Sequence, residues 1–189
     1  MVGRTAAFKR EIATIDPRDL FFVDEAGSHV AMTRTHARAP VGKRAHAKVP
    51  RCRGTVTTML AALTITGIAA VAAIEGATDA SVFTTFTREI LAPQLHPGAV
   101  VVLDNLAAHR VNEVRQIVEA EGARLLFQPQ YSPEFNAIEE AWGKVKGVIR
   151  TMEPRTIEAL DAAIAAGCNA VTPEDAIGYI RHAGYRINR

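Results

Sequence analysis

Three acidic residues, Asp24, Asp104 and Glu139, are placed where their carboxylates could bind metal ions. Asp24 follows the apolar run 20–23, and Asp104 follows the apolar run 99–103. In parallel α/β sheets the functional crevice lies outside the carboxyl ends of the strands. Oxygen ligands suit Mg²⁺ or Mn²⁺, and two such ions can activate an attacking oxygen and stabilise a leaving oxygen. The three acids therefore predict a two-metal site that acts on phosphodiester bonds.

Asp24 is expected to bridge the two ions, because its strand is expected at the centre of the sheet. Asp104 and Glu139 would each hold one ion. A structural role is an alternative for Asp104, whose side chain could cap a helix. Glu25 is expected to support the site or to face solvent, because adjacent strand residues point to opposite faces of a sheet.

Glu139 lies in a predicted amphipathic helix that begins at Ser132, where a capping hydroxyl precedes a Pro-Glu pair. At 100° per residue from Phe135, Glu139 falls at about 40° and Glu140 at about 140°. The apolar face lies at about 280° to 340° and consists of Ile138, Trp142, Val145 and Ile149. Glu139 can therefore look into a groove beside the sheet, whereas Glu140 is expected to face water.

The remaining chain predicts alternating strands and helices. Strands are expected over residues 20–24, 99–103 and 123–127, with a hairpin over 56–74. Helices are expected over 79–91 and 111–122, and in the last third of the chain. This pattern predicts an α/β fold: a five-stranded mixed sheet with helices on both faces. Residues 1–18 are interpreted as a polar lead-in segment, and residues 19–189 as one catalytic domain with C-terminal helices.

Length and composition agree with a globular protein. The 189 residues are 48% hydrophobic, enough for one domain with a sizeable core. Residues 56–74 carry no charge and approach the length of a membrane span, but their four threonines favour a β-hairpin. The two cysteines lack metal-binding spacing, and residues 1–10 lack the apolar core of a signal peptide. We therefore expect no membrane partner and a cytoplasmic location.

Positive charge is concentrated in one segment. It contains seven basic residues and no acid: Arg34, Arg38, Lys43, Arg44, Lys48, Arg51 and Arg53. The rest of the chain has more acidic than basic residues. A basic segment on an acidic body predicts a polyanionic partner. A solvated surface loop is the alternative.

Residues 131–139, Tyr-Ser-Pro-Glu-Phe-Asn-Ala-Ile-Glu, resemble the Tyr-Ser-Pro-(Asp/Glu)-x-Asn-Pro-Ile-Glu signature of mariner-like DDE transposases, particularly those of bacterial insertion sequences. Asp104-Asn105 followed by His109 resembles the second motif of that family, and residues 23–25 resemble the first. The 34 residues between Asp104 and Glu139 match the family spacing. The resemblance covers about residues 18–150, and Ala137 departs from it where the family usually has Pro.

This resemblance implies a ribonuclease H-like fold, a DDE site with two Mg²⁺ or Mn²⁺ ions, and DNA transposition into short target sites, typically TA. Asn105, His109 and Asn136 are expected to support the site, although a structural role is an alternative for each. The resemblance also implies a homodimer acting on paired element ends. Family members usually carry helix-turn-helix domains ahead of the catalytic domain, and residues 1–19 cannot form one. A separate helix-turn-helix protein is therefore a possible partner.

Two other classes of protein remain open. The first is a ribonuclease H-like nuclease that hydrolyses nucleic acid without strand transfer, which would use the same acids. The second is a non-catalytic DNA-binding remnant of a transposable element, against which the presence of all three acids argues. A small-molecule enzyme is disfavoured, because no Gly-rich phosphate loop follows any expected strand.

Overall fold

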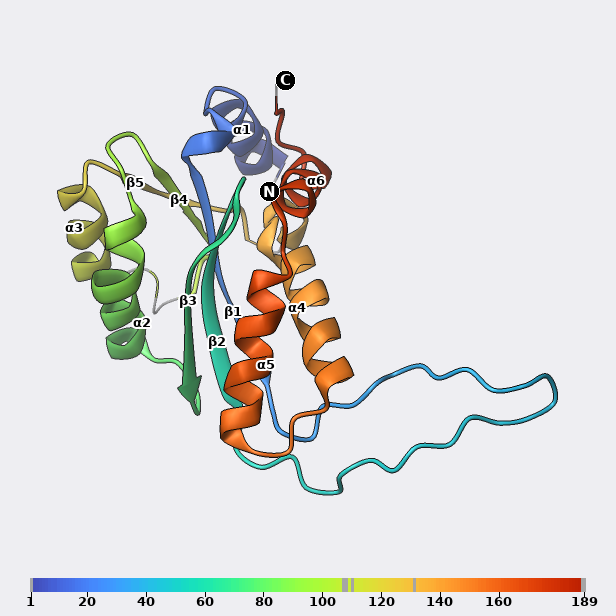
Figure 1. The fold of residues 1–189 in the computed structure, drawn as a ribbon. Helices are drawn as coiled ribbons and strands as arrows, with labels where there is room; N and C mark the ends of the chain where they lie inside the picture. Colours follow the sequence, from blue (N-terminus) through green and yellow to red (C-terminus); the bar gives the residue numbers. More distant parts are fainter. Residues whose placement is uncertain (1, 107–108, 110, 131, 188–189) are drawn as a thin grey trace.

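A five-stranded sheet forms the centre of the computed structural model, which describes residues 2–106, 109, 111–130 and 132–187 (Figure 1). Its strands are β1 (Leu20–Ser28), β2 (Thr57–Thr64), β3 (Gly67–Glu75), β4 (Val100–Leu103) and β5 (Arg124–Phe127). The order across the sheet is β3-β2-β1-β4-β5. The β1–β2 and β2–β3 pairs are antiparallel, whereas β1–β4 and β4–β5 are parallel. The predicted mixed sheet is confirmed, with β1 at its centre.

Helices cover both faces of the sheet, as predicted (Figure 1). One face packs against α4 (Ile138–Met152), α5 (Ile157–Asn169) and α6 (Pro173–His182), with α1 (Val2–Ile12) at its edge. The other face packs against α2 (Ala80–Phe86), its π-helical continuation η2 (Thr87–Leu91), and α3 (Asn112–Ala120). Short 3₁₀ turns are η1 (Pro17–Asp19), η3 (Ala92–Gln94) and η5 (Pro133–Phe135). No helix of the described residues is long and apolar enough to cross a membrane.

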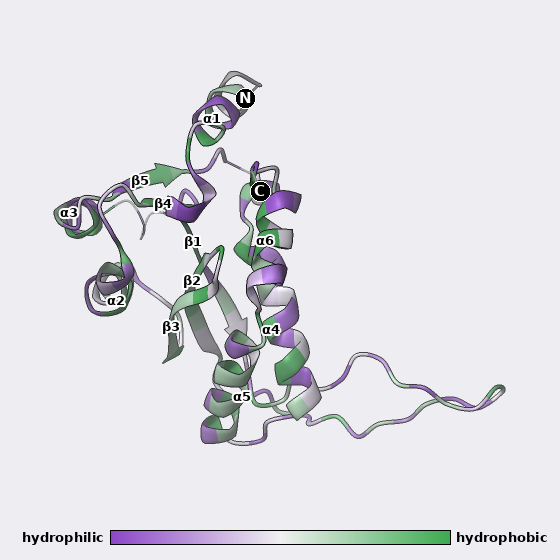
Figure 2. Cartoon of the chain, turned by 45° about the horizontal axis from the view of Figure 1, so that its top comes forward, coloured by the Kyte–Doolittle hydropathy of each residue, from purple (hydrophilic) through white to green (hydrophobic). Residues whose placement is uncertain are grey.

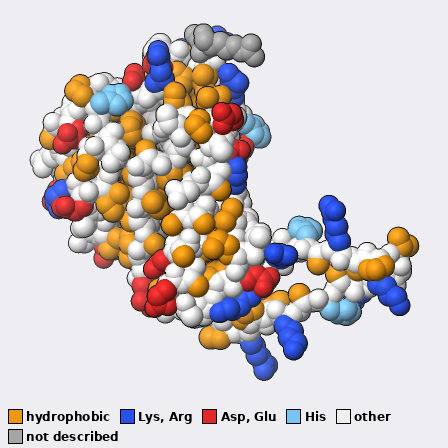
Figure 3. Space-filling view, in the orientation of Figure 1, with side chains coloured by type: hydrophobic (Ala, Val, Ile, Leu, Met, Phe, Trp, Pro, Cys, Tyr) orange, Lys and Arg blue, Asp and Glu red, His pale blue; other side chains and the backbone are white. Residues whose placement is uncertain are grey.

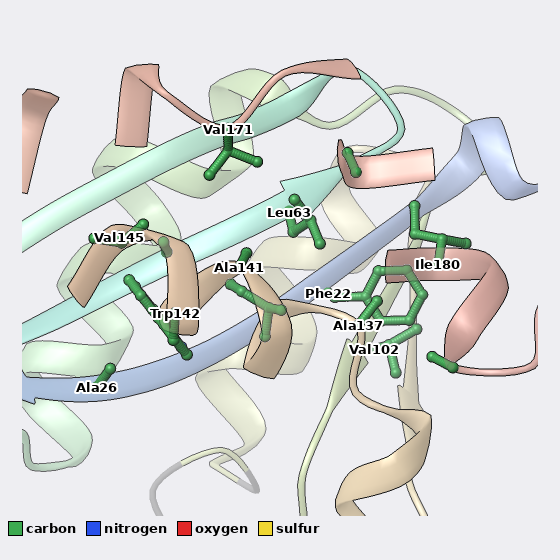
Figure 4. Close-up of a cluster of buried hydrophobic side chains, with 14 of the residues drawn as sticks. Phe22, Ala26, Leu63, Val102, Ala137, Ala141, Trp142, Val145, Val171 and Ile180 are labelled. Carbon is green, nitrogen blue, oxygen red and sulfur yellow. The ribbon is translucent and has the colours of Figure 1, made fainter. Parts of the chain in front are cut away.

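The alternation of side chains along β1 creates two hydrophobic cores. Phe22 and Ala26 point into the core under α4, α5 and α6 (Figure 4). Phe21 and Val23 point into the core under α2 and α3. Trp142 is buried in the first core, as predicted for the apolar face of its helix. A strand buried on both faces in this way is held rigidly, and residues near its end are positioned with it.

The predicted polar lead-in over residues 1–18 contains a helix. In α1, Phe8 and Ile12 are buried in the core that α4 and α6 share. The ring of Phe8 lies 5.4 Å from the ring of Phe135, centroid to centroid. Two apolar residues four positions apart, among several charged ones, give too sparse a pattern to indicate this packing from sequence.

The helix that carries Glu139 begins later than predicted. Ser132 does not cap it, and a 3₁₀ turn and a short break precede α4. The Tyr185 hydroxyl donates a hydrogen bond to the carbonyl of Phe135 at 3.0 Å. A continuous helix would use that carbonyl for the N–H of Glu139, which instead donates to the carbonyl of Asn136. A tertiary contact from the C-terminal segment thus coincides with the interruption.

Residues 29–56, here called the basic arm, connect β1 to β2 and project away from the sheet (Figures 1 and 2). All seven of its Lys and Arg side chains are exposed, and none forms a salt bridge with a described residue. At the root, Nη1 of Arg155 donates to the carbonyls of Val30 and Met32 at 3.3 and 3.2 Å. The arm is therefore anchored at its base and solvated along its length.

Candidate active site

The two aspartates are brought together by the parallel pairing of β1 and β4. Phe22 pairs with Val102, so Asp24 and Asp104 each lie two residues further along neighbouring chains. Asp104 follows the last residue of β4, as predicted. Asp24 was expected to end its strand, but β1 continues to Ser28 in pairing with β2. Asp24 therefore lies where the parallel partner ends and the central strand loses its neighbour on that side.

A pocket of about 390 Å³ opens at this point, and all three predicted acids line it. Asp24 forms part of its buried floor, with 8% of its surface exposed. Asp104 is half-buried, and Glu139 is exposed at the start of α4. Glu140 points elsewhere and forms an ion pair with His182. The helical spacing therefore selected the glutamate that faces the pocket. Tyr131, which belongs to the same sequence motif, lies outside the described residues.

The negative charges of the three acidic side chains in this pocket repel one another. Burial, and then the negative charges of Glu139 and Asp104, raise the pKa of Asp24 to about 7, despite opposing effects of a backbone hydrogen bond and of His109. A carboxyl group with this pKa is only partly ionised at neutral pH. A cation in the pocket would favour the ionised form, because opposite charge lowers the pKa of an acid.

Asp104 has the opposite electrostatic environment. Its Oδ1 accepts hydrogen bonds from Nδ1 of His109 at 2.6 Å and from the N–H of Leu106 at 3.0 Å. Burial alone would raise the pKa of Asp104, but these two hydrogen bonds outweigh it, and the pKa lies below its ordinary value. Both bonds end on the same oxygen. Asp104 is thus favoured in its ionised form and oriented through Oδ1, and no described residue donates a hydrogen bond to its Oδ2.

His109 lies between two carboxylates. It is fully buried, and its ring stacks against Phe83 of α2 with centroids 4.1 Å apart. Its Nε2 lies 3.5 Å from Oε1 of Glu25, within ion-pair distance but without hydrogen-bond geometry. Glu25 points to the opposite face of β1 from Asp24, as expected. Its link to the site is the contact with His109. No sequence signal linked Phe83 or Glu25 to this histidine.

Amide side chains form the other wall of the pocket. Asn105, Gln128 and Asn136 all line it, and Asn105 donates a hydrogen bond through Nδ2 to the carbonyl of Gln128. Gln128 and Asn136 are 5% and 6% exposed. Among the described residues, neither Gln128 Nε2 nor Asn136 Oδ1 has a hydrogen-bond partner. Such buried orphan atoms are costly in a fold and call for an explanation.

The carboxylates do not form a ready-made cage for a single ion. In the part of the chain that the structure describes, no group of three His, Cys, Asp or Glu side chains is arranged to hold one metal ion. The pKa of Asp24 is nevertheless raised by the charges of both Asp104 and Glu139. Carboxylate oxygens are the donors that Mg²⁺ and Mn²⁺ prefer.

The seven predicted DNA-binding residues are not in the pocket. Arg34, Arg38, Lys43, Arg44, Lys48, Arg51 and Arg53 are all on the basic arm. Figure 3 shows Lys and Arg side chains spread along this projection. The structure therefore brings the three acids, Asn105, His109 and Asn136 together, and places the basic segment apart from them.

Several solved structures share this fold. The Mos1 transposase paired-end complex with left transposon end has a TM-score of 0.73 at 14% identity, over 95% of this chain and 56% of that chain. The Mos1 mariner paired-end complex with Mn gives 0.71 at 17% identity, over 94% and 55%. The catalytic domain of Mos1 mariner transposase gives 0.58 at 14% identity, over 97% and 91%. The predicted ribonuclease H-like fold is confirmed. The chain spans about half the length of the first two structures.

The family is shown by sequence. The family model described as DDE superfamily endonuclease matches residues 19–161, so the chain belongs to this family. This match confirms the resemblance carried by residues 23–25, 104–109 and 131–139. A comparison with curated proteins gave no match.

Proposed function

We propose that this chain is the catalytic domain of a DNA transposase that cuts DNA strands at the ends of a mobile element and joins them to target DNA. The observation that carries the proposal is the convergence of Asp24, Asp104 and Glu139 on one pocket in a DDE endonuclease. The similar Mos1 structures include a strand transfer complex, which favours transposition over simple hydrolysis.

Mg²⁺ or Mn²⁺ is the proposed cofactor, with Asp24 shared between two ions and Asp104 and Glu139 each holding one. The similar Mos1 structures include paired-end complexes with Mn and with Mg. Two such ions supply an activated oxygen nucleophile and a stabilised leaving oxygen. Burial and the neighbouring carboxylates raise the pKa of Asp24, and a cation shared with Asp104 and Glu139 would offset this repulsion and favour the ionised form.

The residues around the acids act by orienting them. His109 and the N–H of Leu106 fix one oxygen of Asp104. Burial of His109 against Phe83 prevents its ring from turning. The hydrogen bond of Asn105 to the Gln128 carbonyl ties the segment after β4 to the segment after β5. These interactions keep the pocket walls in register before DNA arrives, so that little reorganisation is needed on binding.

DNA is the proposed partner, and the basic arm is its proposed electrostatic contact. Seven exposed cations on one projection can neutralise several phosphates without specifying sequence. Recognition of the element ends is assigned to a helix-turn-helix module, on a separate protein or a linked segment, and the active species is proposed to be a homodimer on paired ends. The free cysteines Cys52 and Cys168 are compatible with the proposed cytoplasmic location.

Nicking of supercoiled plasmid by the purified chain, in Mn²⁺, Mg²⁺ or EDTA, tests the proposal. We expect nicking that requires metal and is abolished in Asp104→Asn. Glu140→Gln is the matched control, because this carboxylate is paired with His182 outside the pocket. Metal-independent nicking, or equal nicking by Asp104→Asn, would refute the assigned site.

A ribonuclease H-like nuclease is the alternative function, since the same pocket could hydrolyse a strand without joining it. Product analysis separates the two. A transposase joins 3′-hydroxyl ends to a labelled target duplex, whereas a nuclease releases fragments and joins none.

A further inference from the structure

Gln128 and Asn136, on the amide-lined wall of the pocket, have side-chain atoms without hydrogen-bond partners among the described residues. Gln128 follows β5, and its backbone N–H is held by the carbonyl of Leu103 at 2.8 Å. Its side chain is almost completely buried, yet among the described residues its Nε2 has no acceptor. Asn136 presents an unpaired acceptor, Oδ1, in the same pocket. One unsatisfied donor and one unsatisfied acceptor therefore belong to two buried side chains that contribute to the lining of the same pocket.

The cost of these orphan atoms points to a ligand. A buried polar atom without a hydrogen-bond partner destabilises the folded state, whereas an apolar side chain of the same shape carries no such penalty. Leu or Met would suit positions so fully buried. The amides are therefore poor choices for folding and good choices for hydrogen bonds to something that enters the pocket.

The residues around the two amides restrict the chemical class of the ligand. The acidic wall, with its proposed ions, is suited to a phosphodiester. The amide wall carries no formal charge and is therefore suited to a neutral group next to that phosphate. Leu106, which is 49% exposed, and Pro129 provide apolar surface in the same pocket. A pocket of about 390 Å³ is within the size range that accepts small organic ligands.

We propose that Gln128 and Asn136 form a subsite for one nucleotide base beside the phosphodiester that is cut, with amide hydrogen bonds to the base edge and Leu106 and Pro129 against the ring. The inference rests on the proposed function, because it places the phosphate at the acids. An unpaired base offers adjacent donor and acceptor atoms on its edge. The strand is therefore locally unpaired when it occupies the pocket, as in other enzymes that read an extruded base.

A second pocket extends the surface along which the strand could continue. It has a volume of about 270 Å³ and shares Asn105, Gln128, Pro129 and Gln130 with the first. Its far wall includes Phe8 and Glu11 of α1. Gln128 therefore lies at the junction of two adjoining hollows, as expected for a residue that contacts a chain passing from one to the other.

Binding of short fluorescein-labelled single-stranded DNA, measured by anisotropy in Ca²⁺, tests the subsite. The comparison probe is an abasic phosphodiester chain of the same length. We expect the wild-type chain to bind the intact probe about tenfold more tightly, which is the size of effect expected from paired hydrogen bonds to a base edge. Gln128→Leu should reduce this preference to about twofold or less while leaving abasic binding unchanged, and Asn136→Leu should act in the same direction.

Gln116→Leu is the matched control, because Gln116 is exposed on α3 and lines neither pocket. It should keep the full preference. Thermal unfolding completes the test: Gln128→Leu should keep or raise the midpoint, because an apolar group replaces an unpaired buried amide. A structural role for Gln128 would lower the midpoint instead.

Three results would overturn the subsite: a wild-type chain that does not distinguish the probes, a Gln128→Leu variant that weakens both equally, or one that changes neither. The binding assay involves no cleavage, so it is independent of the nicking test. Base-dependent binding without nicking would refute the proposed activity and keep the subsite. Nicking without base-dependent binding would keep the proposed activity and refute the subsite.

Discussion

The basic arm and the acidic pocket solve opposite physical problems. In the pocket, the carboxylates of Asp24, Asp104 and Glu139 repel one another, and burial together with this repulsion raises the pKa of Asp24 to about 7. On the arm, seven cations are spread through solvent and need no partner in the folded chain. The pocket depends on exact placement by a sheet buried on both faces, whereas the arm depends only on its charge and its reach. Substitutions in the pocket should therefore affect catalysis, whereas substitutions on the arm should affect DNA binding.

The largest effect is expected from removal of a pocket carboxylate. Asp24→Asn, Asp104→Asn and Glu139→Gln should each reduce metal-dependent nicking by about 1,000-fold or more, because each removes a charge that would hold one of the proposed ions. Glu140→Gln should change the rate by less than about twofold, since it lies outside the pocket. Initial rates of plasmid nicking give the comparison. Full activity in Glu139→Gln together with inactivity of Glu140→Gln would contradict the helix orientation.

A second effect separates activity from stability at the same residue. The folded-state pKa of Asp24, about 7, exceeds its unfolded value, so the folded state holds a proton that the unfolded chain has released between about pH 4 and 7. Stability of the metal-free protein therefore falls as pH rises through this window, by on the order of 4 kcal/mol from this group.

Asp24→Asn should remove that fall. Urea unfolding in EDTA at about pH 4 and about pH 8 measures it. The variant should match the wild type at the lower pH and be more stable at the higher one, although it is inactive. A variant that is less stable at both pH values would show that the carboxylate is needed for folding.

A smaller loss is expected from His109. His109→Asn removes the ring that fixes Asp104 and should weaken Mn²⁺ binding by about 10- to 100-fold, as for other residues that orient metal ligands. Mn²⁺ titration followed by electron paramagnetic resonance measures this directly. His96→Asn is a suitable control, because His96 is half exposed and lies outside the pocket. Equal Mn²⁺ affinity in wild type and His109→Asn would show that His109 does not contribute to metal binding.

The arm should respond through salt dependence. Replacing Arg34, Arg38, Lys43 and Arg44 with Gln should weaken binding to all DNA sequences alike and flatten the log–log salt slope by up to about 3.6, because each phosphate that is no longer neutralised reduces it by about 0.9. The free energy of unfolding should change by less than about 0.5 kcal/mol, because these side chains are exposed and form no salt bridge with a described residue, and Arg34 makes only a 3.5 Å hydrogen bond to the carbonyl of Thr151. An unchanged slope would show that the arm is a solvated loop.

Much of the fold was predictable because its signals are local. The apolar runs before Asp24 and Asp104 marked the two strands, and the threonine-rich stretch marked the hairpin of β2 and β3. The choice of Glu139 over Glu140 followed from helical spacing, which one residue of register error would have destroyed. The placement of Asp24 and Asp104 in one pocket followed from the parallel pairing of β1 and β4.

What sequence could not supply depends on contacts between distant segments. The late start of α4 is linked to the Tyr185 hydroxyl on the Phe135 carbonyl, 50 residues apart in the chain. The contact between His109 and Glu25 joins two segments that are adjacent only in the folded sheet. The burial of Gln128 is likewise visible only once β5 and α4 are placed. Local patterns carry no information about such pairs.

Gly167 sets how close α5 can approach α4, the helix that carries Glu139. A Cβ atom at this position would lie 2.9 Å from Cγ1 and 3.0 Å from the backbone oxygen of Val145. One hydrogen atom thus determines the spacing of two helices, and through it the height of the third acid above the sheet. A screen for inactive variants should therefore detect residue 167, although it lies outside the pocket, and a smaller side chain at Val145 should restore activity only in part, because the close approach to the Val145 backbone remains.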